Sequence, residues 1–264
     1  MADGRVDLEH ALSVAAQAAR EAGQILRERA SSIREIRHKG AVDLVTDVDV
    51  ASEALVRRVI LGAFPDHTIL GEEGGAIAGS DAGSRWHVDP LDGTTNYAHG
   101  FPFFCVSIGL EVDGALAVGA VYDPNLDELF LARRDQPATL NGQPIHVSAI
   151  DTLRDGLLAT GFPYEQAHFA RAVRSFEALS HRSLAVRRAG SAALDMCYVA
   201  CGRLEGYWEH RINSWDIAAG VLLVQQAGGR VTQPDGAPFT LAATQILASN
   251  CLLHASLVES LAGR

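Results

Sequence analysis

The chain has 264 residues, of which 48% are hydrophobic and 20% are charged, and this balance excludes a disordered protein. Its 22 basic and 32 acidic residues give a net charge of −10. An acidic total argues against nucleic-acid binding, because proteins of that class usually carry a basic face. It also suggests that some carboxylates are gathered around a cation.

Neither targeting signals nor disulfides are expected. Residues 1–10 are polar and charged with no apolar signal core, and the apolar runs are far shorter than a membrane span. The four cysteines are too few for a disulfide scaffold and are expected to be small buried residues in a reducing compartment: Cys105, Cys197, Cys201 and Cys251. We therefore expect a cytoplasmic protein with no membrane partner and no nucleic-acid partner.

The first half of the chain predicts two helices followed by a series of strands. Apolar residues three and four positions apart predict helices over 6–30 and about 48–64. Extended segments are expected at 67–70, 85–88, 105–112 and 115–121. The third of these alternates strictly, as a half-buried strand does, and Asp113-Gly114 predicts a hairpin between the last two. We expect an antiparallel meander with helices packed against it.

After about residue 150 the pattern changes to alternating strands and helices. Strands are expected at 157–160, 184–188 and 246–248, and helices at 170–180, 192–201, 216–227 and the C-terminus. This order predicts an α/β fold with an α+β first half. We expect one compact unit over 1–264, with subdomains of about 1–150 and 151–264.

Three acidic clusters stand where a strand ends or a helix begins. They are Gly71-Glu72-Glu73-Gly74-Gly75, the segment 86–96, and the segment 214–220. In the second cluster a strand is expected to end at Asp89, and Asp92 precedes Gly93-Thr94-Thr95 at an expected helix start. Free N–H groups at a helix start attract phosphate, and carboxylates beside that anion require a cation between them. The arrangement therefore indicates metal-assisted phosphoryl chemistry.

Each cluster also has a purely structural explanation. Asp-Pro-x-Asp-Gly is common in turns and at helix starts. A pair such as Glu72-Glu73 often lies in a solvated loop, and Asp216 would be a favourable charge in a first helical turn. No single cluster decides between the structural and the functional explanation.

Together and in this order, the clusters make the chain resemble the inositol monophosphatase family of Mg²⁺-dependent, lithium-sensitive phosphatases. The matching motifs are Gly71-Glu72-Glu73, Trp86-x-x-Asp89-Pro90-x-Asp92-Gly93-Thr94, and Trp215-Asp216-x-Ala218-Ala219 with Gly228-Gly229 downstream. The resemblance begins at Val42-Asp43-Leu44-Val45-Thr46 and covers nearly the whole chain. It implies a layered αβαβα sandwich of the inositol monophosphatase and fructose-1,6-bisphosphatase type, with metal ions between the subdomains. It also implies a homodimer and inhibition by Li⁺.

The resemblance implies a metal-binding role for five residues. Glu72, Asp89 and the backbone carbonyl of Leu91 would hold one Mg²⁺, and Asp89, Asp92 and Asp216 would hold a second. Glu72 would also face a third, more hydrated ion. Most of these ligands belong to the first subdomain, and the second subdomain would decide substrate specificity.

Further roles are implied around the expected helix start. Thr94, supported by Asp49, would orient the attacking water, and the N–H groups of Gly93 and Thr94 would bind the phosphate. Asp47 does not share a helix face with Asp49 and is expected to be a cap or a surface residue. Lys39 stands near the position of a family lysine, in a segment that is shorter here.

Substrate choice is expected to depend on two segments of the second half. Gly190-Ser191-Ala192 matches a family segment whose backbone touches substrate hydroxyls, and Glu209 matches a glutamate that accepts hydrogen bonds from inositol. Alternatively, Glu209 ends a strand and pairs with Arg211. Arg187, Arg188 and Arg211 would be solvated surface residues or contacts for a second phosphate.

The leading hypothesis is a phosphomonoesterase that acts on inositol 1-phosphate or a similar small polyol phosphate. Histidinol phosphate, a sugar bisphosphate and a nucleotide 3′-phosphate remain alternative substrates. An alternative of another class is a regulatory binding protein that has kept the fold.

Overall fold

The computed structural model describes residues 6–30, 36–38, 44–163 and 166–262. Its helices are α1 (Leu8–Arg29), α2 (Asp47–Ala63), α3 (Thr94–His99), α4 (Gln166–Ser180), α5 (Ala192–Ala200), α6 (Ser214–Gln226) and α7 (His254–Leu261). A short 3₁₀ turn covers Leu153–Asp155. The longest helix, α1, is capped by Asp7, whose side chain accepts hydrogen bonds from the N–H groups of Glu9 and His10.

An eight-stranded sheet occupies the first half of the chain, in the order β10-β9-β8-β7-β6-β5-β3-β4. Its strands are β3 (His67–Gly71), β4 (Gly75–Ile77), β5 (Asp81–Asp92), β6 (Cys105–Val112), β7 (Ala115–Asp123), β8 (Glu128–Arg133), β9 (Thr139–Leu140) and β10 (Gln143–Pro144). Only the pairing of β3 with β5 is parallel. The β6–β7 hairpin turns at Asp113 and Gly114, which both have positive φ, and this confirms the predicted turn.

A five-stranded sheet occupies the second half, in the order β12-β11-β13-β15-β14. Its strands are β11 (Leu157–Thr160), β12 (Ala185–Arg187), β13 (Gly206–Glu209), β14 (Arg230–Thr232) and β15 (Ile246–Ser249). The strand β11 is parallel to both of its neighbours, and β15 is antiparallel to both of its own. A separate antiparallel pair joins β1 (Ile36–His38) to β2 (Leu44–Thr46).

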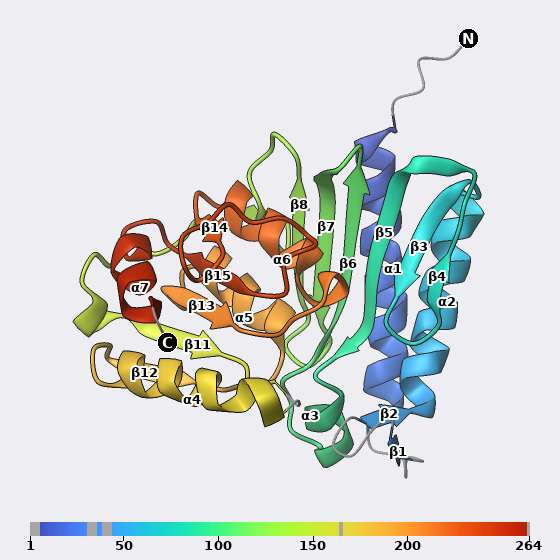
Figure 1. Ribbon diagram of the computed structural model, residues 1–264. Coiled ribbons are helices and arrows are strands. Elements are labelled where there is room, and N and C mark those ends of the chain that lie inside the picture. The colour runs from blue at the N-terminus through green and yellow to red at the C-terminus, as the bar shows by residue number, and fades with distance from the viewer. Residues whose placement is uncertain (1–5, 31–35, 39–43, 164–165, 263–264) are drawn as a thin grey trace.

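The helices and the two sheets form five layers (Figure 1). The helices α1 and α2 cover the outer face of the eight-stranded sheet, α5 and α6 lie between the sheets, and α4 and α7 cover the outer face of the five-stranded sheet. This arrangement confirms the predicted α/β class and the predicted αβαβα sandwich. In the described part of the chain, no helix combines the length and the apolar character needed to cross a membrane.

The strand β6 is buried on both faces, so the prediction of a half-buried strand was wrong. Val106 and Ile108 pack in the cluster that contains the apolar face of α1. On the opposite face stands Gly109, where an added Cβ would lie 2.7 Å from the Cβ of Ala218 in α6. Small residues on this face look polar in a sequence pattern, but here they give α6 room to lie close to the sheet.

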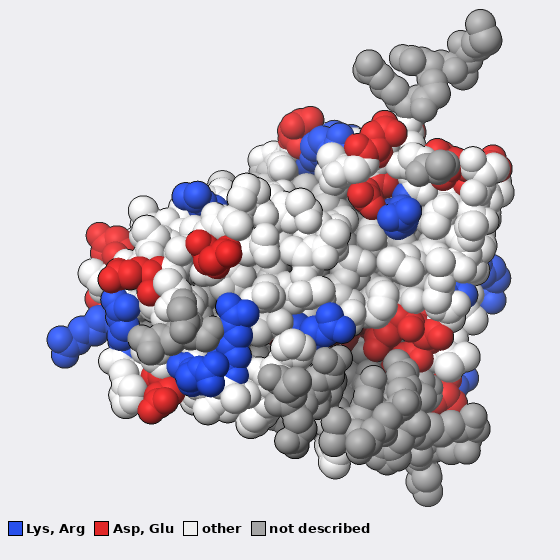
Figure 2. Space-filling view, viewed as in Figure 1, with Lys and Arg blue, Asp and Glu red and all other residues white. Residues whose placement is uncertain are grey.

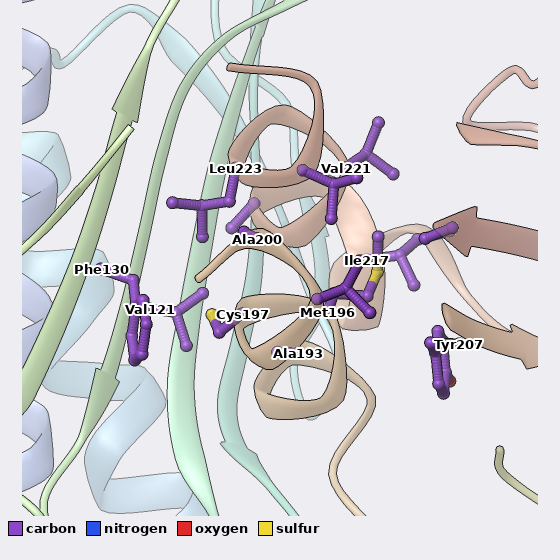
Figure 3. Close-up of a cluster of buried hydrophobic side chains, with 14 of the residues drawn as sticks. Val121, Phe130, Ala193, Met196, Cys197, Ala200, Tyr207, Ile217, Val221 and Leu223 are labelled. Carbon is purple, nitrogen blue, oxygen red and sulfur yellow. The ribbon is translucent and has the colours of Figure 1, made fainter. Parts of the chain in front are cut away.

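The middle helices form a continuous core with both sheets (Figure 3). Val121 and Phe130 of the first sheet face α5 and its Cys197, while Tyr207 of the second sheet approaches from the other side. Cys197 is therefore a core residue, as predicted. Cys251 differs from the prediction because it is exposed, in a turn with φ of 68° after β15.

Candidate active site

A cavity of about 520 Å³ is lined by residues from both sheets and from α5 and α6. It brings together every residue predicted to bind a metal or the substrate: Glu72, Asp89, Leu91, Asp92, Gly93, Thr94, Gly190, Ser191, Ala192, Glu209 and Asp216. Arg188 and Arg211 also line the cavity, whereas Arg187 is exposed and is not part of its lining. On the face shown in Figure 2, Lys and Arg side chains gather over α4, and Asp and Glu side chains gather beside the ends of β3 and β4.

Two of the predicted carboxylates, Asp89 and Asp92, lie on β5 at a β-bulge. The strand was expected to end at Asp89, but it continues to Asp92, and its pairing with β6 shifts register between these two residues. Pro90 lies in the shifted segment and has no N–H to donate to the ladder. The N–H of Leu91 turns inward and donates to Asp89 Oδ1 over 3.0 Å. A bulge of this kind re-aims side chains, and here both Asp89 and Asp92 line the cavity.

The short helix α3 begins directly after the bulge. Gly93 has φ of +104°, and a Cβ there would lie 2.9 Å from the carbonyl oxygen of Phe103, so only glycine fits. The Thr94 hydroxyl lies 3.1 Å from Asp49 Oδ1 and 3.1 Å from the carbonyl oxygen of Leu91. Asp49 is fully buried on α2, behind Thr94, which lines the cavity, so two residues that are far apart in the chain meet beside it.

Asp92 is held by the start of α5, a contact that sequence reasoning missed. Its Oδ2 accepts hydrogen bonds of 2.7 Å from the Ser191 hydroxyl and 2.7 Å from the N–H of Ala193. Ser191 also caps α5, since its hydroxyl accepts a hydrogen bond from the N–H of Leu194. These bonds join the carboxylate of one sheet to the helix layer that carries the predicted substrate residues.

The carboxylates in the cavity raise one another's pKa. Burial and the neighbouring charges of Glu72, Asp92 and Asp216 raise the pKa of Asp89 well above its usual range. Burial, together with Asp92 and Glu72, does the same to the pKa of Asp216. Burial raises the pKa of Asp92 to about 6, even though the hydrogen bond from Ser191 opposes the shift. Buried like charges of this kind need a cation beside them in order to stay ionised.

The donor set fits a hard divalent cation. One oxygen of Asp89 and one of Asp216 are hydrogen-bonded, the latter to the N–H of Asn213 over 2.8 Å. The other oxygen of each has no hydrogen-bond partner within the described part of the chain, so it is available to an ion. Among the residues described, no three Asp, Glu, His or Cys side chains converge closely enough to hold an ion by themselves. Mg²⁺ suits such a set because it keeps several waters and takes substrate oxygens in addition to one or two carboxylates.

Two side chains of α2, Glu53 and Arg57, hold the loop that carries Glu72. The sequence analysis did not predict this contact, which we call the clamp. Buried Glu53 accepts hydrogen bonds of 2.8 Å from the N–H groups of both Glu73 and Gly74. Arg57 lies 2.8 Å from Glu53 and donates to the carbonyl oxygen of Gly75 over 2.8 Å. Position 53 lies one helical turn beyond Asp49, which is the only signal that the sequence offers for this contact.

Glu209 stands at the far side of the cavity, at the end of β13. Its Oε2 accepts a hydrogen bond of 2.5 Å from the Tyr207 hydroxyl, a contact that the sequence did not suggest. Burial raises the pKa of Glu209 to about 7, although the Tyr207 bond lowers it. A Cβ at Gly161 would overlap the Glu209 carboxylate, so glycine leaves the space that this carboxylate fills.

Asp47 lies outside the site, as expected, and Lys39 cannot be placed. Asp47 is exposed and lies 3.4 Å from Arg29, as expected of a surface residue. Lys39 and the neighbouring Asp43 lie outside the described residues.

A five-layer sandwich whose cavity gathers buried carboxylates beside a hydrogen-bonded threonine fits the class of metal-assisted phosphate-ester hydrolases. Residues 7–263 match the model of the inositol monophosphatase family. The chain is 44% identical over 258 residues to the inositol-1-monophosphatase of Synechocystis sp., and the match covers 97% of this chain and 90% of that protein. The chain therefore belongs to the inositol monophosphatase family, which confirms the resemblance, and it is a phosphoric monoester hydrolase.

Two further relatives carry a different name. The Nus factor SuhB of Haemophilus influenzae is 44% identical over 242 residues, covering 90% of this chain and 90% of that protein. The crystal structure of the extragenic suppressor protein suhB from Bartonella henselae superposes with a TM-score of 0.93 at 37% identity, covering 96% of this chain and 99% of that chain. This solved structure supports the layered fold described above.

Proposed function

We propose that the protein is a Mg²⁺-dependent phosphomonoesterase that hydrolyses inositol 1-phosphate, or a similar small polyol phosphate, to the alcohol and inorganic phosphate. The observation that carries the proposal is the group of carboxylates formed by buried Asp89 and partly buried Asp92 and Asp216, beside the Thr94–Asp49 pair. The name of the Synechocystis relative, inositol-1-monophosphatase, supports the substrate class.

Five residues would hold two or three Mg²⁺ ions. Glu72, Asp89 and the carbonyl oxygen of Leu91 would bind one ion, and Asp89, Asp92 and Asp216 would bind another, as the family resemblance implies. Because no three such side chains converge closely enough among the described residues, the three aspartates would have to draw together around that ion. When bound, the ions would neutralise phosphate oxygens, lower the pKa of a bound water and offset charge on the leaving oxygen. The chain's own contribution is to keep these acids ionised and in place, through the hydrogen bonds from Leu91, Ser191 and Asn213.

The Thr94–Asp49 pair would position the attacking water. A hydroxyl has one hydrogen to donate and two lone pairs that accept. Because Asp49 and the carbonyl oxygen of Leu91 both accept from the single Thr94 hydrogen, the lone pairs of Thr94 are left to accept a hydrogen bond from water. The N–H groups of Gly93 and Thr94 would bind the phosphate at the start of α3.

The opposite wall would bind the alcohol. The backbone of Gly190-Ser191-Ala192 and the carboxylate of Glu209 line this wall, and a carboxylate is a good acceptor for substrate hydroxyls. Histidinol phosphate remains the alternative, since its ammonium group would also meet Glu209. The family resemblance is also our ground for expecting a homodimer and slower turnover in millimolar Li⁺.

Phosphate release in the presence of Mg²⁺ would test the proposal. The substrates are inositol 1-phosphate, histidinol phosphate, fructose 1,6-bisphosphate and adenosine 3′,5′-bisphosphate. We expect the highest kcat/KM with inositol 1-phosphate. A preference for histidinol phosphate would keep the chemistry and change the pathway. If no ester is hydrolysed, the regulatory alternative is favoured, for which the name Nus factor of the Haemophilus relative is the supporting observation.

The clamp under the Glu72 loop leads to a separate prediction. Glu53→Gln replaces one accepting oxygen by an NH₂ group, so one loop N–H and Arg57 lose their charged partner. We expect the free energy of unfolding to fall by about 2 kcal/mol, and the Mg²⁺ concentration for half-maximal activity to rise. Urea unfolding and a Mg²⁺ titration of phosphate release measure the two effects. Glu9→Gln, at an exposed ion pair with Arg133, is the control and should change neither. An unaltered Mg²⁺ requirement in Glu53→Gln would show that the clamp does not position Glu72.

A further inference from the structure

A second carboxylate, besides that of Glu209, lines the substrate side of the cavity and has no role in the mechanism above. Asp195 lies in the first turn of α5, with its N–H donating to the Ser191 carbonyl over 3.0 Å. Its side chain is only 2% exposed, and it forms part of the cavity wall. The sequence motifs did not single it out, because the matched segment stops at Ala192.

The carboxylate of Asp195 has no hydrogen bond or ion pair with any residue that the structure describes. Its oxygens are not among the fully enclosed, unpartnered atoms of the described residues, so they open onto the cavity, and an apolar side chain at this position would avoid the cost of largely desolvating them. Buried polar groups in folded proteins are otherwise almost always satisfied. A partner that arrives with the substrate would satisfy this carboxylate.

The surroundings of Asp195 place its carboxylate between the two halves of the cavity. Burial first, and then the charges of Asp92 and Glu209, raise the pKa of Asp195 well above its usual range, while Arg188 opposes the shift. All three neighbouring charges belong to the cavity wall. Asp195 therefore shares the cavity wall with Asp92 on the proposed metal side and with Glu209 on the proposed alcohol side.

Part of the hydrogen-bonding capacity of the Glu209 carboxylate is already used within the chain. One of its oxygens accepts the Tyr207 hydroxyl over 2.5 Å, and its carboxylate fills the space beside Gly161. The lone pairs of Asp195 have no such partner within the chain. Of the two acceptors on this wall, Asp195 thus has the greater unused capacity for donors from a ligand.

We propose that Asp195 binds the substrate, accepting a hydrogen bond from a hydroxyl or other donor group of the leaving alcohol. This inference rests on the proposed function and narrows its substrate class. With Asp195 and Glu209 on one wall, the site takes alcohols that carry at least two hydrogen-bond donors besides the phosphate ester. A monoester without such donors leaves Asp195 unsatisfied and gains nothing from it.

The test compares two esters in three variants. Inositol 1-phosphate offers several hydroxyl donors, and p-nitrophenyl phosphate offers none on its alcohol side. For Asp195→Ala we expect KM for inositol 1-phosphate to rise about tenfold with a small change in kcat, and KM for p-nitrophenyl phosphate to stay unchanged. Asp195→Asn keeps the shape and one accepting oxygen, so we expect a smaller rise. It also keeps the test decisive if the alanine variant folds poorly.

Asp123→Asn is the matched control. Asp123 is 1% exposed and its pKa is also raised by burial, but it caps the turn after β7 and lies outside the cavity. Its substitution should leave the ratio of kcat/KM between the two esters unchanged. Equal effects of the Asp195 variants on both esters, or no effect on either, would overturn the role of Asp195 alone. If the wild-type protein hydrolyses neither ester with Mg²⁺, the proposed function itself fails, and this inference fails with it.

Discussion

Asp89→Asn is expected to lower kcat for phosphate release on the order of 10³-fold, the effect of removing one preorganised electrostatic contact to a transition state. Asp89 is 2% exposed and is the carboxylate that Glu72, Asp92 and Asp216 all influence. Asparagine keeps the shape and an accepting oxygen but removes the charge that would bind two ions. The measurement is phosphate release from inositol 1-phosphate at saturating Mg²⁺.

The control for this variant is Asp47→Asn. Asp47 is exposed on α2 and lies 3.4 Å from Arg29, so its loss should leave kcat unchanged. Full activity in Asp89→Asn would contradict the proposed metal site, whatever the substrate preference of the wild type.

The pH dependence of stability provides a second measurement for the Asp89→Asn variant. Asp89, Asp92 and Asp216 have raised pKa values in the folded state, so the metal-free folded chain binds more protons than the unfolded chain. The free energy of unfolding therefore falls as the pH rises above about 4, where aspartate titrates in the unfolded chain. The fall continues through the folded-state pKa of Asp92, about 6, and through the higher folded-state pKa values of Asp89 and Asp216. We expect Mg²⁺ to raise Tm more at pH 8 than at pH 5. In Asp89→Asn this difference should shrink, and an equal Mg²⁺ effect at both pH values in the wild type would contradict the carboxylate site.

Gly109→Val is expected to lower the free energy of unfolding by roughly 3 kcal/mol, at the upper end of the usual cost of overpacking. A Cβ on Gly109 would lie 2.7 Å from the Cβ of Ala218 and 3.0 Å from the backbone nitrogen of Ala219, so α6 would have to move away from the sheet. The same helix carries Asp216 into the cavity. The variant should therefore also lose part of the Tm increase that Mg²⁺ gives.

Gly62→Ala is the matched control, because nothing lies within 4 Å of a Cβ at that position in α2. Alanine favours helix over glycine by up to about 1 kcal/mol, so this variant should equal or exceed the wild type in stability. Urea unfolding measures both variants. If Gly109→Val unfolds at the same urea concentration as the wild type, α6 does not pack on β6 as closely as described.

Local patterns predicted most of the elements. Apolar spacing predicted the helices α1 and α2, and Asp113-Gly114 predicted the β6–β7 hairpin. Both signals are local, because they depend on residues only a few positions apart. The short strand β13 entered the sequence analysis only through the alternative that Glu209 ends a strand, because its four residues gain their order from β11 and β15 on either side. The extension of β5 beyond Asp89 was missed because a proline in a strand is tolerated only at an edge or a bulge, and the bulge depends on the partner strand.

The amino-acid sequence by itself determined the family, the fold class and the identity of the acidic residues, because short motifs of fixed spacing carry them. Only the tertiary structure decided which groups meet. Glu53 binds the loop that carries Glu72, Asp92 accepts a hydrogen bond from Ser191, and Asp195 and Glu209 line the same cavity. These contacts join segments that lie up to a hundred residues apart, and the packing of α2, α5 and α6 against the two sheets sets their distances. No local spacing rule contains that information.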